Sequence, residues 1–483
     1  MEKLFKLTGN LQAGAILMKV MLININSREK QDPHKSSTPI VAAPLGLLYI
    51  ASSALSAGHE VSLIDAYAES LSMEALLAKI KRQEPDLIGF TLYTNDLDYV
   101  YTFTKQMKKA NSNLIIVTGG VYATIVPEKV LREFPAIDYL LRGEAERSFV
   151  LLLDELEKRK PLLERVDGLS YRKEGRIKHN KDACFQKNID DLPLPAKYLL
   201  NRKKYFCALS KRSPIDVMIT SRGCPYKCTF CYQSSPDYRM HSPERVLEEI
   251  REIADAGIKG IEIYDENFIV DKKRVNKILD MIQKENIGIE FRLRARVDSV
   301  NKNLLERLKK AGCSIISYGI EFGDQEILNK TNKGITLEMC ENAIKMTKKA
   351  GIGTLGFFMM GVPGETRESI AKTINFAIKL NPDFAAFTVF MPMYKTKEYD
   401  FAKSKGWLIG DYGIGKHMPW VKLPWMKSLS DIQELRDYAF RKFYFRPNYM
   451  INFMLRNIRS NNWKQIDFAR KNLFNHLNKY NPI

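Results

Sequence analysis

The chain contains few cysteines and no long uninterrupted hydrophobic run. No apolar stretch approaches the roughly 18 residues that a membrane-spanning helix needs, and the N-terminus lacks the apolar core and small-residue cleavage site of a secretory signal. Only seven cysteines occur among 483 residues. Because three of them are clustered, they fit a metal site in a reducing compartment better than a disulfide framework. These absences predict a cytoplasmic protein.

Positive charge exceeds negative charge along the chain. The formal net charge is +19, and the hydrophobic content of 45% is sufficient for full cores. An excess of positive charge favours acidic partners such as phosphates, carboxylates or anionic lipid. From Arg436 onward, ten Lys or Arg residues face two acidic residues. A solvated basic surface is the simpler interpretation of this region, and peripheral membrane contact is the alternative.

The three clustered cysteines are Cys224, Cys228 and Cys231. Thiolates suit zinc or an iron-sulfur cluster. Structural zinc needs four ligands, but no fourth cysteine or histidine follows closely. A 4Fe-4S cluster held by three cysteines leaves one iron open to bind and reduce another molecule. Because the cysteines lie beside Gly223 and Pro225 in a turn-forming run, they are poor core residues, and a metal site is favoured.

The spacing Cys-x3-Cys-x2-Cys, with Phe230 just before the last cysteine, resembles the radical SAM superfamily. In that family the open iron is chelated by the amino and carboxylate groups of S-adenosylmethionine (SAM). An electron from the cluster then cleaves SAM to a 5′-deoxyadenosyl radical. The resemblance implies that Cys224, Cys228 and Cys231 hold the cluster and that Phe230 contacts SAM. It also implies an electron donor such as flavodoxin or ferredoxin.

Residues 18–150 alternate between strand and helix patterns, which predicts a parallel sheet covered on both faces. Ligands of such sheets bind at the carboxyl ends of the strands. Because the first strand is not followed by Gly-x-Gly-x-x-Gly, a dinucleotide is disfavoured. The expected strands are 18–25, 61–64, 87–91, 114–118 and 139–141, and the main expected helices are 44–58, 73–83 and 96–110.

This region also resembles the cobalamin-binding domain that precedes many radical SAM cores, so we expect a Rossmann-like (flavodoxin-like) fold. In such domains a Ser or Thr follows the third strand and a Gly-Gly follows the fourth, which implies that Thr91, Gly119 and Gly120 contact cobalamin. Glycines there let the backbone approach a flat macrocycle. His34 stands in an Asp-x-His string without the usual Gly, so we expect a loop histidine rather than a cobalt ligand. The other motifs of this resemblance are 44–51, 57–61, 64–65 and 142–146.

The remaining regions follow from the same patterns. Residues 1–17 are expected to form an N-terminal extension, and 151–213 a connector that contains a small hairpin at 168–177. From 214 to 400, six strand–helix units predict a partial (β/α)6 radical SAM barrel, in which chemistry takes place at the carboxyl ends of the strands. Residues 401–483 are expected to form a helical C-terminal region. The expected barrel strands are 217–220, 258–264, 287–293, 314–320, 354–360 and 384–390.

Two strand ends of this barrel carry candidate SAM-binding residues. Tyr264, Asp265 and Glu266 close the second strand and resemble the family segment that receives the methionyl amino group. Arg294 and Arg296 follow the third strand at a spacing that places them on one side of it. Because a guanidinium group is a natural fork for a carboxylate, we expect Arg294 first, and Arg296 second, to bind the SAM carboxylate.

Two further strand ends complete the candidate site. Glu321, in Gly-Ile-Glu-Phe-Gly, resembles the family's Gly-Ile-Glu-Ser-Gly segment, with Phe322 at the usual serine position. The segment that begins at Gly361 resembles the one whose backbone lies against the adenine. After the sixth strand, residues 392–396 lack the family's Pro-Gly, which leaves the loop on the substrate side undefined.

Together, the resemblances imply a cobalamin-dependent radical SAM enzyme with a 4Fe-4S cluster, SAM and cobalamin as cofactors. The favoured activity is methyl transfer to an unactivated carbon or a phosphorus centre through a 5′-deoxyadenosyl radical and methylcobalamin. The substrate is a small molecule, lipid, tetrapyrrole or peptide, and the sequence does not choose among them.

Three alternatives remain. The enzyme could be a cobalamin-dependent radical SAM cyclase or ring-rearranging enzyme without methyl transfer. The chain could also be a non-catalytic cofactor-binding sensor or carrier. A transfer RNA methylthiotransferase would explain the basic charge, but the first cysteine along the chain is Cys184, so the three N-terminal cysteines of a second cluster are absent. Nucleic acid is therefore not an expected partner.

Overall fold

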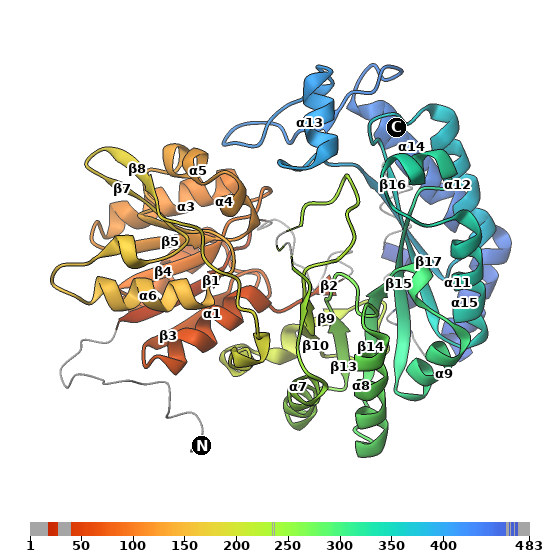
Figure 1. Ribbon diagram of the computed structural model, residues 1–483, viewed down its shortest axis with the longest axis horizontal. Helices are drawn as coiled ribbons and strands as arrows, with labels where there is room; N and C mark the ends of the chain where they lie inside the picture. The colour runs from red at the N-terminus through yellow and green to blue at the C-terminus, as the bar shows by residue number, and fades with distance from the viewer. Residues whose placement is uncertain are drawn as a thin grey trace. The chain divides into compact units, whose positions relative to one another are not determined.

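The computed structural model describes residues 18–27, 40–233, 235, 237–459, 463, 465–467 and 469–471. The chain divides into two compact units, the first formed mainly by residues 43–204 and the second mainly by residues 205–412 and 417 onward (Figure 1). Each unit is built on its own parallel sheet. The expected N-terminal extension and His34 lie outside the described residues.

The first unit contains a seven-stranded sheet of order β3-β1-β4-β5-β6-β7-β8. The first five strands of that order are parallel, and their chain order corresponds to the 2-1-3-4-5 order of flavodoxin-like folds. The predicted hairpin forms β7 and β8, which extend the sheet in antiparallel fashion. The strands are β1 Lys19–Asn24, β3 Glu60–Asp65, β4 Leu87–Thr91, β5 Ile115–Gly119, β6 Tyr139–Leu141, β7 Leu169–Lys173 and β8 Arg176–His179.

Helices accompany this sheet because its central strands are apolar along their whole length. Residues 87–90 of β4 and the four central residues of β1 are buried, as expected for parallel strands that are covered on both faces. Ser72 caps α2 by accepting a hydrogen bond from the Ala75 amide at 3.2 Å. The helices are α1 Leu45–Ser56, α2 Met73–Gln83, α3 Leu97–Ala110, α4 Val121–Ile125, α5 Pro127–Glu133 and α6 Glu146–Leu156.

The second unit contains six parallel strands in chain order, β10-β13-β14-β15-β16-β17. This is the strand order of the predicted partial (β/α)6 barrel, so the fold class is confirmed for both units. All six carboxyl ends lie along one edge of the sheet, because the strands are parallel. The strands are β10 Ile215–Met218, β13 Gly260–Ile263, β14 Glu290–Ala295, β15 Cys313–Glu321, β16 Gly353–Met360 and β17 Phe384–Val389.

Amphipathic helices pack on this sheet and enclose its hydrophobic core (Figure 1). The first of them begins with a Ser242 cap and with Pro243 at the first helical position, where proline is favoured. The helices of the strand–helix units are α7 Pro243–Asp255, α8 Lys272–Glu285, α9 Lys302–Lys310, α10 Gln325–Lys330, α11 Leu337–Lys349 and α12 Arg367–Leu380. The C-terminal region adds α13 Lys397–Ser404, α14 Leu429–Tyr444 and α15 Pro447–Arg459.

Three short antiparallel pairs complete the second unit. One of them, β11 with β12, lies on either side of the cysteine loop and holds the two ends of that loop together. Within the described residues, no helix combines the length and apolar character required to cross a bilayer. The pairs are β2 Ile40–Val41 with β9 Phe206–Cys207, β11 Ser221–Arg222 with β12 Arg239–Met240, and β18 Leu408–Ile409 with β19 Trp420–Val421.

Candidate active site

The cysteine loop follows the carboxyl end of the first barrel strand and is anchored from several sides. Gly223 opens the loop with a φ of 81°, and a Cβ there would lie 2.5 Å from the Asp237 carbonyl oxygen, so no larger residue fits. The Thr229 amide donates to the Thr331 carbonyl at 3.0 Å. Its hydroxyl donates to the Glu398 carboxylate at 2.5 Å. The loop therefore takes its shape from α10 and α13 as well as from its own sequence.

The three cysteines of this loop form a donor set that fits an iron-sulfur cluster. Cys224 and Cys228 are half-buried and Cys231 is exposed. The three cysteines lie on one short loop, whose ends are joined by the pairing of β11 with β12. Although the Cys231 residue is exposed as a whole, desolvation by the surrounding loop, Glu266 and the two other cysteines raise its pKa to about 11, and burial raises the pKa of Cys224. The thiols of Cys224 and Cys231 therefore keep their protons at neutral pH unless a metal displaces them.

A preformed zinc site is not present in this loop. Among the described residues, no three side chains of metal-binding type lie close enough together to hold one metal ion. A cubane spreads its thiolate ligands over three separate iron corners, so it needs a wider arrangement than a single tetrahedral ion. Three thiols without a fourth ligand therefore fit a 4Fe-4S cluster with one open iron.

Asp265 holds the residues that directly precede the cysteine loop. It is buried and accepts hydrogen bonds from the Thr220 amide at 2.5 Å, the Thr220 hydroxyl at 2.5 Å and the Ser221 hydroxyl at 2.7 Å. Burial raises the pKa of Asp265. These three bonds hold the end of β10 where the loop begins. The next residue, Glu266, is exposed and lies close enough to Cys231 to influence its pKa.

The two predicted arginines differ in their surroundings. The Arg294 guanidinium lies 4.8 Å from the centre of the Tyr264 ring, and no ion pair of Arg294 is present within the described part of the chain. Arg296 forms an ion pair with Asp298 at 2.9 Å and lies 3.7 Å from the Tyr226 ring. The guanidinium of Arg294 is therefore more available to a ligand carboxylate.

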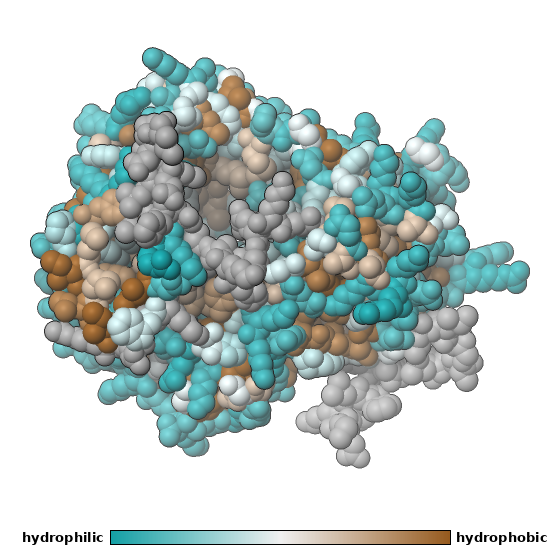
Figure 2. Space-filling view, turned by 180° about the vertical axis from the view of Figure 1, so that it is seen from behind, coloured by the Kyte–Doolittle hydropathy of each residue, from teal (hydrophilic) through white to brown (hydrophobic). Residues whose placement is uncertain are grey.

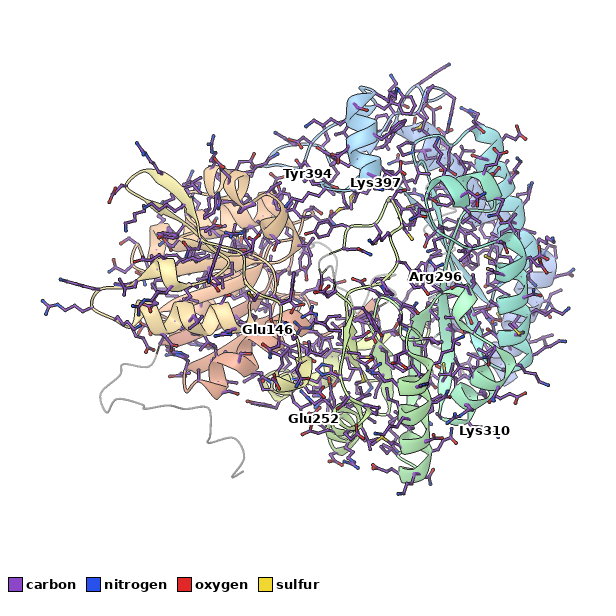
Figure 3. All side chains as sticks on the ribbon, viewed as in Figure 1. Glu146, Glu252, Arg296, Lys310, Tyr394 and Lys397 are labelled. Carbon is purple, nitrogen blue, oxygen red and sulfur yellow. The ribbon has the colours of Figure 1, made fainter. Side chains whose placement is uncertain are left out.

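Figure 3 shows that Arg296 lies at the site end of the second unit, whereas Lys310 lies at the other end. Arg296 follows the carboxyl end of β14, and Lys310 ends the helix that leads into the amino end of β15. This separation shows which edge of the sheet carries the candidate residues.

Glu321 and a lysine that sequence reasoning missed form a buried ion pair beside the cysteine loop. Glu321 has a φ of 70°, and the pairing of β15 with β16 shifts register at this point. Its carboxylate lies 3.0 Å from the Lys333 amine, which is 5.8 Å from the Phe230 ring. Phe230 in turn packs edge-to-face on Phe322 at 6.1 Å. The structure therefore brings together Glu321, Phe230 and Lys333.

Lys333 remains charged although it is buried. Burial alone would lower its pKa, but Glu321 and Cys228 raise it further than burial lowers it. In the sequence, Lys333 stands in an Asn-Lys-Gly turn, which is typical of exposed residues, so its burial had no local signal.

The segment at Gly361 is held by a second residue that sequence reasoning missed. Gly361 has a φ of 99°. One carboxylate oxygen of Glu365 accepts from the Gly361 amide at 2.5 Å and from the Val362 amide at 3.0 Å. The other oxygen is buried without a partner among the described residues. Burial raises the pKa of Glu365 to about 8, so the carboxyl group is protonated at neutral pH.

In the first unit, the three predicted cobalamin-binding residues lie next to one another. Thr91 ends β4 and pairs with Gly119, which ends β5. Gly120 has a φ of 96°, and a Cβ there would lie 2.6 Å from the Thr91 methyl group. The residues are half-buried at the carboxyl edge of the sheet. Gly120 is thus required by its backbone conformation and by Thr91, and it lies at the edge where parallel α/β sheets bind their ligands.

Comparison with known proteins identifies both units. The model of the Radical SAM superfamily matches residues 218–377, and the model of the B12 binding domain matches residues 37–153. An uncharacterized methyltransferase of Pyrococcus horikoshii is 35% identical over 446 residues, which are 90% of this chain and 95% of that protein. The chain therefore belongs to the B12-binding radical SAM enzymes. Their cofactors are a 4Fe-4S cluster, SAM and cobalamin.

Solved structures and a further relative agree with this assignment. The radical SAM methyltransferase TsrM of Kitasatospora setae, with cobalamin and a [4Fe-4S] cluster bound, superposes with a TM-score of 0.70 at 16% identity over 90% of each chain. OxsB, a cobalamin-dependent SAM radical enzyme, gives a TM-score of 0.71 at 19% identity over 94% of this chain and 72% of OxsB. Both show the shared fold. The anaerobic magnesium-protoporphyrin IX monomethyl ester cyclase of Rubrivivax gelatinosus is 28% identical over 72% of this chain, which spans 64% of that cyclase.

Proposed function

We propose that the protein is a cobalamin-dependent radical SAM methyltransferase that acts on an unactivated carbon or a phosphorus centre. The observation that carries this proposal is the 35% identity with a methyltransferase that the chain covers almost completely. Two further relatives have related names. They are a cytidylyl-2-hydroxyethylphosphonate methyltransferase of Streptomyces wedmorensis and a hopanoid C-3 methylase of Methylococcus capsulatus.

The residues of the chain would bind and orient the reacting groups. When bound, the cluster supplies the electron that cleaves SAM, and the corrin supplies the methyl group. Cys224, Cys228 and Cys231 would hold the cluster. The exposed carboxylate of Glu266 would accept from the SAM amino group, and the Arg294 guanidinium would donate to the SAM carboxylate. Thr91 and the two glycines beside it would hold cobalamin.

Glu321, Gly361 and Asp265 would act in the SAM site in different ways. The Glu321 carboxylate, already paired with Lys333, is placed to accept from the amino group or ribose of SAM. The Gly361 backbone would lie against the adenine. Asp265 uses three hydrogen bonds on the protein, so we assign it to positioning the cysteine loop rather than to direct contact.

A cyclase without methyl transfer is the second candidate. It is supported by the match to the magnesium-protoporphyrin monomethyl ester cyclase, which extends over 72% of this chain. A small molecule, lipid, tetrapyrrole or peptide would serve as substrate in either case. A flavodoxin or ferredoxin would supply the electron. Counting methyl groups in the product distinguishes the two reactions.

The test is anaerobic reconstitution of the full chain with iron, sulfide and corrin, followed by quantification of all three. On reduction with SAM present, we expect both 5′-deoxyadenosine and S-adenosylhomocysteine. Replacing Cys228 by alanine should abolish the cluster absorbance and both products. Replacing Cys184, an exposed cysteine outside the loop, by serine should leave them unchanged.

Each other outcome has a defined meaning. Deoxyadenosine without S-adenosylhomocysteine would replace the methyltransferase proposal by the cyclase. The absence of both products from an enzyme with full cluster and corrin content would show a non-catalytic sensor or carrier.

A further inference from the structure

Helix α15 presents an apolar face to the solvent. Five large hydrophobic side chains lie on this face with exposed fractions between 42% and 58%. Their spacing of one, three and four residues places them along one side of the helix. Figure 2 shows hydrophobic side chains gathered on the surface over α15. We name this face the α15 stripe; it consists of Met450, Ile451, Met454, Leu455 and Ile458.

The opposite side of α15 carries the polar contacts that attach the helix to the barrel. Arg456 forms an ion pair with Asp383, which directly precedes β17. The Tyr449 hydroxyl donates to the Asp383 carbonyl at 2.7 Å, and the Tyr449 ring stacks on Phe453 at 6.3 Å. A surface helix normally turns its apolar stripe toward the core and its charges toward water. In α15 the aliphatic residues face the solvent instead. Such an exposed apolar face is typical of a surface that binds an apolar partner.

We propose that the α15 stripe lies on the surface of an anionic lipid bilayer. The helix contains no acidic residue, and residues 447–483 contain six Lys or Arg residues and one Asp. Trp463, just beyond the helix, is 59% exposed, and tryptophan favours the level of the lipid headgroups. Apolar aliphatic residues combined with positive charge are the features of helices that bind in the plane of a membrane.

The length of α15 fits a helix that lies on the membrane rather than one that crosses it. Its 13 residues extend about 20 Å, which is less than the roughly 30 Å of a hydrocarbon core. This agrees with the absence of a membrane-spanning helix among the described residues.

Charge distinguishes a lipid surface from a second copy of the chain. A symmetric dimer through the stripe would bring together two C-terminal regions in which six Lys or Arg residues face one Asp (residues 447–483), and like charges repel. Anionic lipid headgroups would attract the same charges. The proposal is independent of the reaction, because it concerns only the attachment of the enzyme to a surface.

The test is sedimentation of the full-length reconstituted enzyme with vesicles. We expect binding to phosphatidylcholine vesicles that contain about 30% phosphatidylglycerol, because anionic headgroups attract the positive charges, and little binding to pure phosphatidylcholine. Raising the salt concentration should weaken the binding. Replacing Ile451 and Leu455 together by serine should weaken it at least about tenfold, because both side chains would lose their insertion into the lipid.

A matched control uses exposed hydrophobic residues outside the stripe. Met339 and Ile409 are 42% and 40% exposed, and replacing both by serine should leave vesicle binding unchanged. Cluster content and the unfolding midpoint verify that both double variants fold. Equal binding by both double variants would overturn the proposal. Absence of binding by the unmodified enzyme would also overturn it, and a dimer that the Ile451/Leu455 variant dissociates would assign the stripe to self-association.

Discussion

The buried carboxyl group of Glu365 gives a pH-dependent prediction for the stability of the second unit. Because burial raises its pKa from 4.5 to about 8, the folded chain binds this proton between pH 4.5 and 8, whereas the unfolded chain releases it. The unfolded state then binds fewer protons, so stability falls as pH rises through this window and is constant above it. The shift corresponds to at most about 5 kcal/mol at 1.36 kcal/mol per pKa unit.

Replacing Glu365 by glutamine should remove this loss of stability at high pH. The amide oxygen can still accept from the Gly361 and Val362 amides, and the neutral group has no proton to lose. We expect the variant to be as stable as the unmodified protein at pH 5 and more stable at pH 8, by about 1 to 4 kcal/mol. Replacing Glu365 by alanine should lower the free energy of unfolding at both pH values by about 2 to 4 kcal/mol, because two buried amides lose their hydrogen-bond acceptor.

The assay is urea unfolding of the metal-free chain at several pH values from 5 to 8. Glu368 lies three residues after Glu365, in the first turn of α12, and its side chain is 80% exposed. Replacing Glu368 by glutamine is therefore the matched control and should preserve the pH dependence of the unmodified protein. If the Glu365→Gln variant keeps that pH dependence, or loses as much stability at pH 8 as Glu365→Ala, the carboxyl group is not neutral in the folded protein.

Three other substitutions test the remaining contacts. Replacing Lys333 by methionine should destabilise the chain by about 2 to 4 kcal/mol in urea unfolding, because the Glu321 carboxylate is left half-buried without its partner; adding Glu321→Gln should restore part of the loss, and no recovery would contradict the pairing. Replacing Arg294 by lysine should raise the KM for SAM about tenfold in 5′-deoxyadenosine formation, whereas the same change at Arg296 should mainly lower stability; equal KM values would contradict the proposed carboxylate contact. Replacing Gly120 by alanine should lower the free energy of unfolding by about 1 to 3 kcal/mol, because its φ of 96° disfavours a side chain. The same variant should contain less corrin after reconstitution. Unchanged stability and corrin content would contradict the close packing at Thr91.

The alternation of strands and helices was sufficient to predict both sheets, because short apolar runs bounded by turn residues are typical of buried strands and longer amphipathic segments of helices. The boundary of β10 was not predictable in this way. Residues 217–220 were expected to form the strand, but it ends at Met218. The Thr220 amide donates to the Asp265 carboxylate instead of to the sheet, and that partner lies 45 residues further along the chain.

The roles of individual charged residues were less predictable than the fold. Arg292 and Arg294 alternate along β14, and Arg296 directly follows it at the same spacing. In the structure, Arg292 forms a buried ion pair with Glu262 on the neighbouring strand, and Arg296 forms an ion pair with Asp298. A side chain bound in this way cannot serve a ligand without first losing its partner, which costs several kcal/mol for a buried pair.

Arg294 was already the first candidate for the SAM carboxylate in the sequence, and the positions of carboxylates on other elements give the physical reason to prefer it. The same argument applies to Asp265 and Glu266, which are adjacent in the chain. Asp265 points into the base of the cysteine loop, where Thr220 and Ser221 use its oxygens, while Glu266 faces outward beside Cys231. Sequence motifs indicated the strand ends at which we propose that the chemistry takes place, because parallel strands bring those ends together. Which side chain at each end is free to bind depends on pairings across the sheet, and these pairings require the folded structure.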